Sequence, residues 1–312
     1  MTALKDIYLD IYNSIDFEKI KDHPNILIAA GFWEEERYRA AKTCYKFMRA
    51  VDDLIDDHKS AGNTIGEKEQ AEFLAYVDSW LKMIYSGNSS DPFQEELSDT
   101  IKRFRIPSWP LEAFAKSMIY DINNDGFPTL ESFISYAGGA SVAPAAIFVH
   151  LAGLRKSGNG FEAPLFNVKE AASSCAIFSY LVHIIRDFRK DQLNHLNYFA
   201  NDLIEMNGLS RAQLSEIANG AEIPAGFRNM MREYYKLADQ YRAKTNNCIK
   251  EIWDFLEPRY QLSLEIIFDL YVLVFERINI DGGSFSTEEL NPTPGQSAER
   301  VLKTILGSAT LK

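Results

Sequence analysis

Apolar residues recur at three- and four-residue spacing along most of this 312-residue chain, and this periodicity restricts the fold more than any other feature. In residues 34–57, good helix formers surround apolar positions at Tyr38, Ala41 and Tyr45. The same spacing predicts further helices over residues 67–86, 91–104, 110–122, 129–137, 140–156, 168–191, 210–218, 225–254 and 260–278. Because the pattern contains no strand-rich block, we predict an all-α protein.

Helix breakers separate these segments, among them IPSWP at 106–110 and KSGNG at 156–160. The chain shows neither an internal repeat nor an interdomain linker, so we expect one domain over residues 1–312. Residues 281–296 are polar and rich in Gly and Pro, and they predict an irregular segment before a last short helix.

Acidic residues outnumber basic ones, 44 against 33, for a net charge of −11. Bulk electrostatics therefore disfavour nucleic acid or anionic lipid as a partner. Cys44, Cys175 and Cys248 show no CxxC spacing, which is typical of reduced thiols in the cytosol. No basic-then-apolar leader opens the chain, and the longest apolar run, 141–154, falls short of the ~18–20 residues that a bilayer requires. We expect a soluble, cytoplasmic protein without a transmembrane segment.

Two short segments each carry aspartates four residues apart. Residues 49–57 read RAVDDLIDD, and residues 183–191 read HIIRDFRKD. Residues at this spacing lie on one face of a helix, where like charges repel by a few tenths of a kcal/mol (~0.2–0.5). The paired aspartates are Asp52 and Asp56, and Asp187 and Asp191.

A single DxxxD on a helix is most often a solvated face. Here, however, each pair is embedded among apolar residues and follows an arginine, Arg49 or Arg186, whose guanidinium can bind phosphate oxygens bidentately. Two carboxylates on one face suit a hard cation such as Mg²⁺, which completes its shell with water and substrate phosphate. The two pairs together therefore predict a site where Mg²⁺ ions, several per site, bridge carboxylates to a diphosphate.

The segments YKFMRAVDDLIDD and LVHIIRDFRKD resemble the aspartate-rich motifs of the squalene/phytoene synthases. These are all-helical class I terpenoid synthases that join two prenyl diphosphates head to head, and the resemblance covers roughly residues 20–280. It implies a helical bundle around a central apolar pocket. It also implies catalytic and metal-binding roles for Asp52, Asp56, Asp187 and Asp191, with Asp53 as an additional acidic ligand.

The same resemblance implies that five residues contact the diphosphate: His23, Tyr45, Arg49, Arg186 and Tyr271. A carbocation formed after diphosphate leaves must be shielded from water, and aromatic faces can stabilise it. We expect small and aromatic residues to line that pocket, although each one taken singly also fits a plain core position. The candidates are Phe47, Tyr136, Gly138, Gly139, Ala140, Phe178 and Tyr180.

The chain also departs from the family pattern. His183 stands where the second motif usually has asparagine, and we expect it to face the metal as a possible ligand. Tyr180 replaces a common glutamine, and Gly138 and Gly139 replace an aromatic residue, which would widen the pocket and alter the product. The usual basic segment near the end of the family's sequences is absent.

Head-to-head condensation of farnesyl or geranylgeranyl diphosphate is the function that this resemblance favours. Cyclisation of one prenyl diphosphate, and prenyl transfer to another acceptor, would keep both aspartate pairs, so both alternatives stay open. A non-enzymatic helical scaffold fits less well, because all four aspartates are present. A reductive step with NADPH stays open as well, since the chain has no Gly-rich dinucleotide turn. Peripheral membrane contact for release of an apolar product, the product skeleton and the oligomeric state also stay open.

Overall fold

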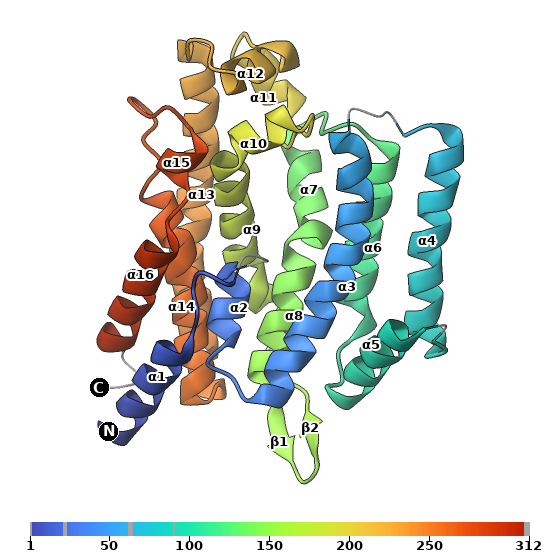
Figure 1. The fold of residues 1–312 in the computed structure, drawn as a ribbon, viewed down its shortest axis with the longest axis vertical. Helices are drawn as coiled ribbons and strands as arrows, with labels where there is room; N and C mark the ends of the chain where they lie inside the picture. The colour runs from blue at the N-terminus through green and yellow to red at the C-terminus, as the bar shows by residue number, and fades with distance from the viewer. Residues whose placement is uncertain (1, 21–23, 62–64, 90, 309–312) are drawn as a thin grey trace.

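The computed structural model describes residues 2–20, 24–61, 65–89 and 91–308, and almost all of its regular structure is helical (Figure 1). The helices are α1 Thr2–Ser14, α2 Pro24–Ala30, α3 Glu35–Ser60, α4 Glu67–Ser86, α5 Pro92–Arg103, α6 Ser108–Asn123, α7 Leu130–Ala140, α8 Val142–Gly153, α9 Val168–Arg186, α10 Phe188–Leu193, α11 Asn201–Met206, α12 Arg211–Ala218, α13 Ala225–Ile252, α14 Pro258–Phe275, α15 Thr287–Leu290 and α16 Pro294–Gly307. A 3-10 turn, η1 (Trp253–Phe255), follows α13, and a hairpin of β1 (Arg155–Ser157) and β2 (Gly160–Glu162) follows α8. The all-α prediction is confirmed.

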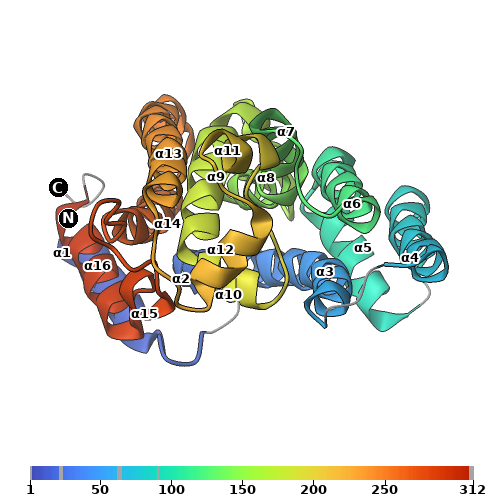
Figure 2. The ribbon, with the colours of Figure 1, turned by 90° about the horizontal axis from the view of Figure 1, so that it is seen from above.

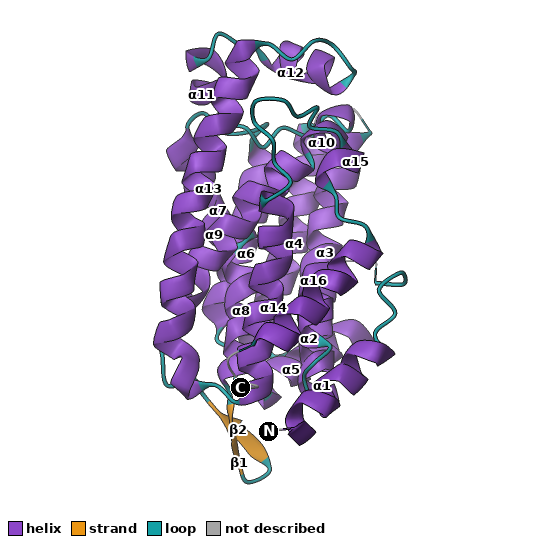
Figure 3. Cartoon of the chain, turned by 90° about the vertical axis from the view of Figure 1, so that its left-hand side faces the viewer, coloured by secondary structure: helices purple, strands orange, loops and turns teal. Residues whose placement is uncertain are grey.

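The long helices stand side by side and surround α8 and α9 at the centre of the bundle (Figures 1 and 2). α9 packs against α13, α8 and α14, while α6 packs against α7, α4 and α8. The short helices α10, α11 and α12 cover one end, and the β1–β2 hairpin projects from the other (Figure 3). This arrangement gives the bundle two different ends.

Local sequence accounts for where several helices begin. The Thr129 side chain accepts a hydrogen bond from Ser132 N, and the Ser132 side chain accepts one from Thr129 N, which is a capping box at the start of α7. Asn167 accepts from the second and third amides of α9. α4 ends at Ser86, and the next residue, Gly87, has a φ of 67°, the left-handed conformation that favours glycine.

Several sequence predictions need correction. The helix predicted over 168–191 breaks at Asp187, and a new helix, α10, starts at Phe188. The amide of Asp191 still donates to the Asp187 carbonyl at 2.8 Å, so the two aspartates remain one turn apart. The helix predicted over 140–156 ends at Gly153 and gives way to the small hairpin. Helices α1, α2, α11 and α15 lie in segments for which no helix was predicted. α15 and the start of α16 fall within residues 281–296, which were predicted to be irregular.

Two stretches among the described residues are long enough and apolar enough to span a bilayer, judged by length and composition alone. They are Leu130–Gly153, with a mean hydropathy of 1.4, and Val168–Arg186, with 1.2. Buried core helices meet the same criteria, and α8 and α9 lie at the centre of the bundle. The stretches are therefore weak grounds for a membrane-spanning role.

Candidate active site

A cavity of about 640 Å³ opens between α3, α7, α8, α9, α13 and α14. One end is apolar and includes Phe148 of α8, Ile252 of α13 and Leu264 of α14. The other end is polar, because α3 and α9 bring their last turns to it and present the aspartates there. The cavity therefore has an apolar interior and an acidic mouth, to which α10 contributes Lys190 and Asp191.

The first aspartate pair lies on the last turns of α3. Asp52 and Asp56 line the cavity, and neither makes an ion pair with any residue that the structure describes. Burial and the neighbouring charges of Asp56 and Asp121 raise the pKa of Asp52 well above its usual range. Burial and the charge of Asp121 likewise raise the pKa of Asp56 to about 6. These raised pKa values mark negative charge that the surrounding protein leaves uncompensated.

Asp53 differs from its neighbours, although it also lines the cavity. Its Oδ1 pairs with Arg49 Nε at 2.6 Å, one turn earlier on α3. Both partners are well exposed, so a diphosphate could draw the Arg49 guanidinium away at little cost.

The second pair sits at the junction of α9 and α10. Asp187 is only 8% exposed and accepts two hydrogen bonds from Arg186, Nε to Oδ1 at 2.7 Å and Nη2 to Oδ2 at 2.8 Å. His183 Nε2 lies 2.6 Å from the same Oδ2. Burial alone would raise the pKa of Asp187, but the charges and hydrogen bonds of His183 and Arg186 hold it well below its usual range.

Asp191 has the opposite electrostatic environment. Burial and the charge of Asp187 raise the pKa of Asp191 to about 8, and the charge of Asp56 on α3 acts in the same direction. Asp191 makes no ion pair among the described residues, and it lines the same cavity. The two acidic motifs, whose corresponding aspartates are 135 residues apart in sequence, therefore face one another across the mouth.

The residues expected to contact diphosphate are placed as follows. Tyr45, Arg49, Arg186 and Tyr271 all line the cavity. Tyr45 Oη donates to the Pro144 carbonyl at 3.1 Å. His23 lies outside the described residues.

Of the predicted lining residues, Tyr136, Ala140 and Tyr180 lie on the cavity wall. Four others are not part of that wall in the described structure. Phe47 packs between Trp80 and Phe114, and Phe178 packs against α14 through Phe268. Both rings are fully buried in the core, because their helix faces point away from the cavity.

The two glycines of α7 also need correction, because neither Gly138 nor Gly139 lines the cavity in the described structure. A Cβ on Gly139 would collide with the Ala113 carbonyl and the Ser117 hydroxyl of α6. A Cβ on Gly138 would meet nothing within 4 Å. Gly139 thus permits close packing of α6 and α7, and the expectation that the glycines widen the pocket is wrong.

Asp121 is a partly buried carboxylate that the sequence analysis did not select, and it lines a small pocket next to the cavity together with Asp56. It accepts a hydrogen bond from Tyr136 Oη, and Lys59 Nζ lies 3.7 Å from its Oδ1. Burial raises the pKa of Asp121 despite these partners. The signal was present in the sequence, since Asp121 and Asp125 form another DxxxD, but the second member lies beyond the end of α6.

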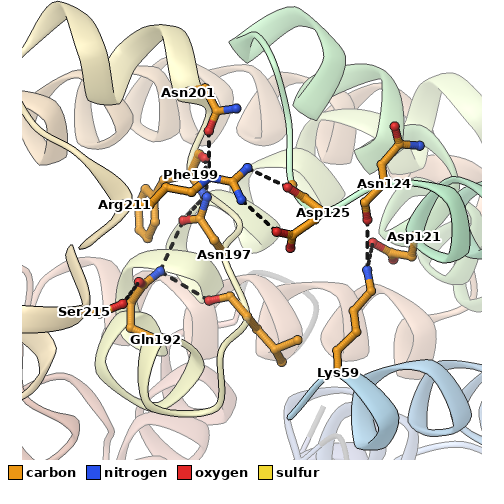
Figure 4. A network of polar contacts seen from close by, with 12 residues as sticks. Lys59, Asp121, Asn124, Asp125, Gln192, Asn197, Phe199, Asn201, Arg211 and Ser215 are labelled. Carbon is orange, nitrogen blue, oxygen red and sulfur yellow. Dashed lines mark hydrogen bonds and ion pairs between the residues drawn. The ribbon is translucent and has the colours of Figure 1, made fainter. Parts of the chain in front are cut away.

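Polar contacts around Arg211 and Gln192 hold the loops at the mouth (Figure 4). Arg211 binds Asp125 Oδ2 and Asn201 Oδ1, each at 3.0 Å, and so ties the α6–α7 loop to the start of α11. Gln192, next to Asp191, donates to Asn197 Oδ1 at 3.1 Å. This network fixes α10, and hence Asp191, relative to the neighbouring loops.

The donor set at the mouth suits Mg²⁺ in its chemistry, because Asp52, Asp56 and Asp191 offer oxygen ligands whose charge is uncompensated. Within the described ranges, no three His, Cys, Asp or Glu side chains gather closely enough to hold an ion by themselves. An ion bound here would therefore complete its shell with diphosphate oxygens and water, which is the usual arrangement for Mg²⁺.

Comparison with solved structures supports the fold. A dehydrosqualene synthase in complex with ligand superposes with a TM-score of 0.71 at 13% identity, covering 96% of both chains. The squalene synthase HpnC from Alicyclobacillus acidocaldarius superposes with a TM-score of 0.65 at 15% identity, covering 85% of this chain and 96% of that one. The architecture is thus the class I terpenoid synthase fold.

Sequence comparison agrees with the structural one. The profile of the squalene/phytoene synthase family matches residues 22–295, and the chain belongs to that family. The phytoene synthase of Arthrospira platensis is 23% identical over 236 residues, which cover 71% of this chain and 72% of that protein. The chloroplastic phytoene synthase of Narcissus pseudonarcissus is 22% identical over 220 residues, which cover 70% of this chain. The chain spans about half the length of this relative, 48% of it.

Proposed function

We propose that this protein is a Mg²⁺-dependent prenyltransferase that joins two prenyl diphosphates, farnesyl or geranylgeranyl, head to head and releases diphosphate. The observation that carries the proposal is the pairing of an acidic mouth with an apolar interior in one cavity of about 640 Å³. Membership of the squalene/phytoene synthase family supports the same reaction class.

The acidic mouth is where the diphosphate would bind. The aspartate pairs of α3 and of the α9–α10 junction would hold Mg²⁺, which when bound offsets the charge of the leaving diphosphate. Arg49 and Arg186 line the same mouth and can donate bidentate hydrogen bonds to phosphate oxygens. Without cations, the carboxylates would repel the diphosphate, so we expect the reaction to depend on metal.

The apolar interior would hold the prenyl chains and exclude water from the allylic cation. Phe148, Tyr136 and Tyr180 place aromatic side chains on the wall, and aromatic faces attract positive charge. Ala140, Ala172 and Ala176 on α7 and α9 leave room for the chains.

Tyr136 and Asp121 are suited to accept a proton. When the double bond of one prenyl chain attacks the allylic cation of the other, the joined product stays cationic until it loses a proton. Tyr136 Oη can take that proton while its own phenolic proton passes to Asp121, with which it is hydrogen bonded. The raised pKa of Asp121 favours this acceptance.

The test is incubation with farnesyl or geranylgeranyl diphosphate and Mg²⁺, with and without NADPH, followed by measurement of diphosphate and mass spectrometry of extracted products. We expect diphosphate release to vanish in EDTA and to return with Mg²⁺. A product with the carbon count of two prenyl chains supports head-to-head joining. A cyclised product from one chain, or turnover that persists without metal, would contradict the proposal.

A further inference from the structure

Tyr180 lies on the cavity wall, on the same face of α9 as Ala176, which is one turn earlier. Its ring stacks on Phe133 of α7 with the centroids 5.4 Å apart, and the ring of Tyr198 meets it edge-on at 6.4 Å. Tyr180 is half-buried, whereas its neighbour Tyr136 is only 5% exposed. Tyr180 therefore presents the more accessible hydroxyl of the two to a ligand in the cavity.

A hydrogen bond links Tyr180 to Tyr136. Burial and the charges of Asp121 and Asp52 raise the pKa of Tyr180 well above its usual range, and the hydrogen bond with Tyr136 acts in the opposite direction. Tyr136 Oη already donates its single proton to Asp121. Tyr180 must therefore be the donor in its hydrogen bond with Tyr136. The protons of both hydroxyls then point toward Asp121.

Asp121 places the end of this chain beside the small pocket that it lines. The pocket has a volume of about 20 Å³, and Lys59 and His195 are among its other lining residues. This is enough for one water molecule, which needs ~10–15 Å³ on this measure. Lys59 Nζ, 3.7 Å from Asp121 Oδ1, favours the ionised carboxylate that can accept a proton (Figure 4). The hydrogen-bonded chain thus connects the main cavity with a polar pocket of the size of a water molecule.

We propose that Tyr180 is the catalytic residue that takes the proton from the joined cation, and that Tyr136 relays a proton from it to Asp121. The inference rests on the proposed function and deepens it, because it moves the point of proton removal from Tyr136 to Tyr180. A relay is favourable here because a charge left inside an apolar cavity is costly.

The transfer begins at a C–H bond beside the cationic carbon. That bond breaks, and its electron pair forms a new C=C bond. The proton binds Tyr180 Oη while the Tyr180 proton passes to Tyr136 Oη and the Tyr136 proton passes to Asp121. Both tyrosines stay neutral, and no oxidant or reductant takes part. Asp121 then loses its proton to water in the small pocket, which restores the carboxylate for the next turnover.

The experiment compares the wild type with Tyr180→Phe in single turnovers of the full chain, with Mg²⁺ and whichever of farnesyl and geranylgeranyl diphosphate the wild type consumes. The variant keeps the ring that stacks on Phe133 and loses only the hydroxyl. We expect rapid-quench measurement to show formation of the joined product slowed by about 10²-fold or more, the usual contribution of a proton acceptor. Release of the first diphosphate should slow much less. Tyr235→Phe, whose ring stacks on Phe275 away from the cavity wall, is the matched control and should leave both rates unchanged.

Tyr136→Phe should slow the same step, because it interrupts the same chain. The double variant Tyr136→Phe/Tyr180→Phe should then be no slower than either single variant, since two members of one relay are not independent. Effects that multiply in the double variant would overturn the relay. So would a Tyr180→Phe variant that forms joined product at the wild-type rate, or one in which both steps slow equally.

A second measurement needs no substrate. In protein labelled with ¹³Cζ-tyrosine, the resonance of Tyr136, assigned by its loss in Tyr136→Phe, reports on the hydrogen bonds of that hydroxyl. It should shift in Tyr180→Phe and not in Tyr235→Phe. An unshifted resonance in an active protein would contradict the relay alone. A shifted resonance in a protein that releases no diphosphate from prenyl substrates would contradict the proposed function, and the catalytic role with it, and leave the hydrogen-bonded chain intact.

Discussion

At the scale of single residues, Asp52 and Asp56 illustrate a site that is unfavourable until it binds its ligand. The two carboxylates share one face of α3. Burial raises the pKa of both, as does the charge of Asp121, and the charge of Asp56 adds to the shift of Asp52. Such groups reduce the stability of the empty protein, and cation binding relieves the repulsion.

Replacing Asp52 by Asn should test this. We expect the rate of diphosphate release to fall by about 100-fold or more. This is the usual effect of removing a group that stabilises the charge developing on the leaving diphosphate. Because one of two repelling charges is removed, the melting temperature in EDTA should hold or rise. Glu67→Gln, at the exposed start of α4, is the control and should leave both quantities unchanged. A large fall in melting temperature for Asp52→Asn would mark the residue as structural.

Asp121 gives a second prediction at this scale. If it accepts the phenolic proton of Tyr136, Asp121→Asn should slow the formation of joined product by about 10²–10⁴-fold, the usual contribution of a proton acceptor. Ionisation of the first substrate needs no such acceptor, so single-turnover diphosphate release should slow much less. Rapid-quench measurement of both products distinguishes the two steps. Equal slowing of both would place Asp121 in diphosphate binding instead.

At the scale of secondary structure elements, the contact of α6 with α7 depends on Gly139. An added methyl group there would meet the Ala113 carbonyl and force the helices apart. We expect Gly139→Ala to lower the free energy of unfolding by about 1–3 kcal/mol, as overpacking typically does.

Gly138 is the matched control, because the same substitution one residue earlier meets open space. Since alanine is the better helix former by about 1 kcal/mol, Gly138→Ala should be neutral or stabilising. Chemical denaturation of both variants makes the comparison. Equal effects would show that helix propensity and not packing governs this turn of α7.

At the scale of the whole molecule, the acidic mouth makes stability depend on pH. The pKa of Asp191 is about 8 in the folded protein and near 4 when unfolded, so between these values the folded state binds more protons. Stability should therefore decrease as pH rises, by at most about 1.4 kcal/mol per pH unit for one group. Between pH 7 and 8.5 unfolded histidines, with a pKa near 6.5, contribute little.

The melting temperature of the metal-free protein should fall from pH 7 to pH 8.5, and this can be followed by scanning calorimetry in EDTA. Asp191→Asn should flatten the dependence, because the titrating group is gone. Mg²⁺ with inorganic pyrophosphate should raise the melting temperature and also weaken its dependence on pH. A wild-type melting temperature that is constant over this range would contradict a protonated Asp191.

Much of the fold could be predicted from the sequence because helices are local structures. Apolar periodicity and breakers placed most of α3 to α9 and α12 to α14, and the spacing of four within each DxxxD placed both members of each pair on the same cavity. The break at Asp187 could not be predicted in this way. It accompanies a change of chain direction into α10, which packs against α12 and is held by contacts of Gln192.

The sequence by itself determined the helical class and the two acidic motifs, since both depend on residues within a few turns of one another. Only the tertiary structure decided which side of a helix faces the cavity and which charges are compensated. Phe47 and Gly139 have the residue types of a pocket wall, yet neighbouring helices cover them. Asp52 and Asp187 are the same residue in similar motifs, but only the second is paired with an arginine, Arg186, and contacted by His183 Nε2. Burial and electrostatic compensation are sums over all neighbours in space, and helix packing brings those neighbours together from distant parts of the chain.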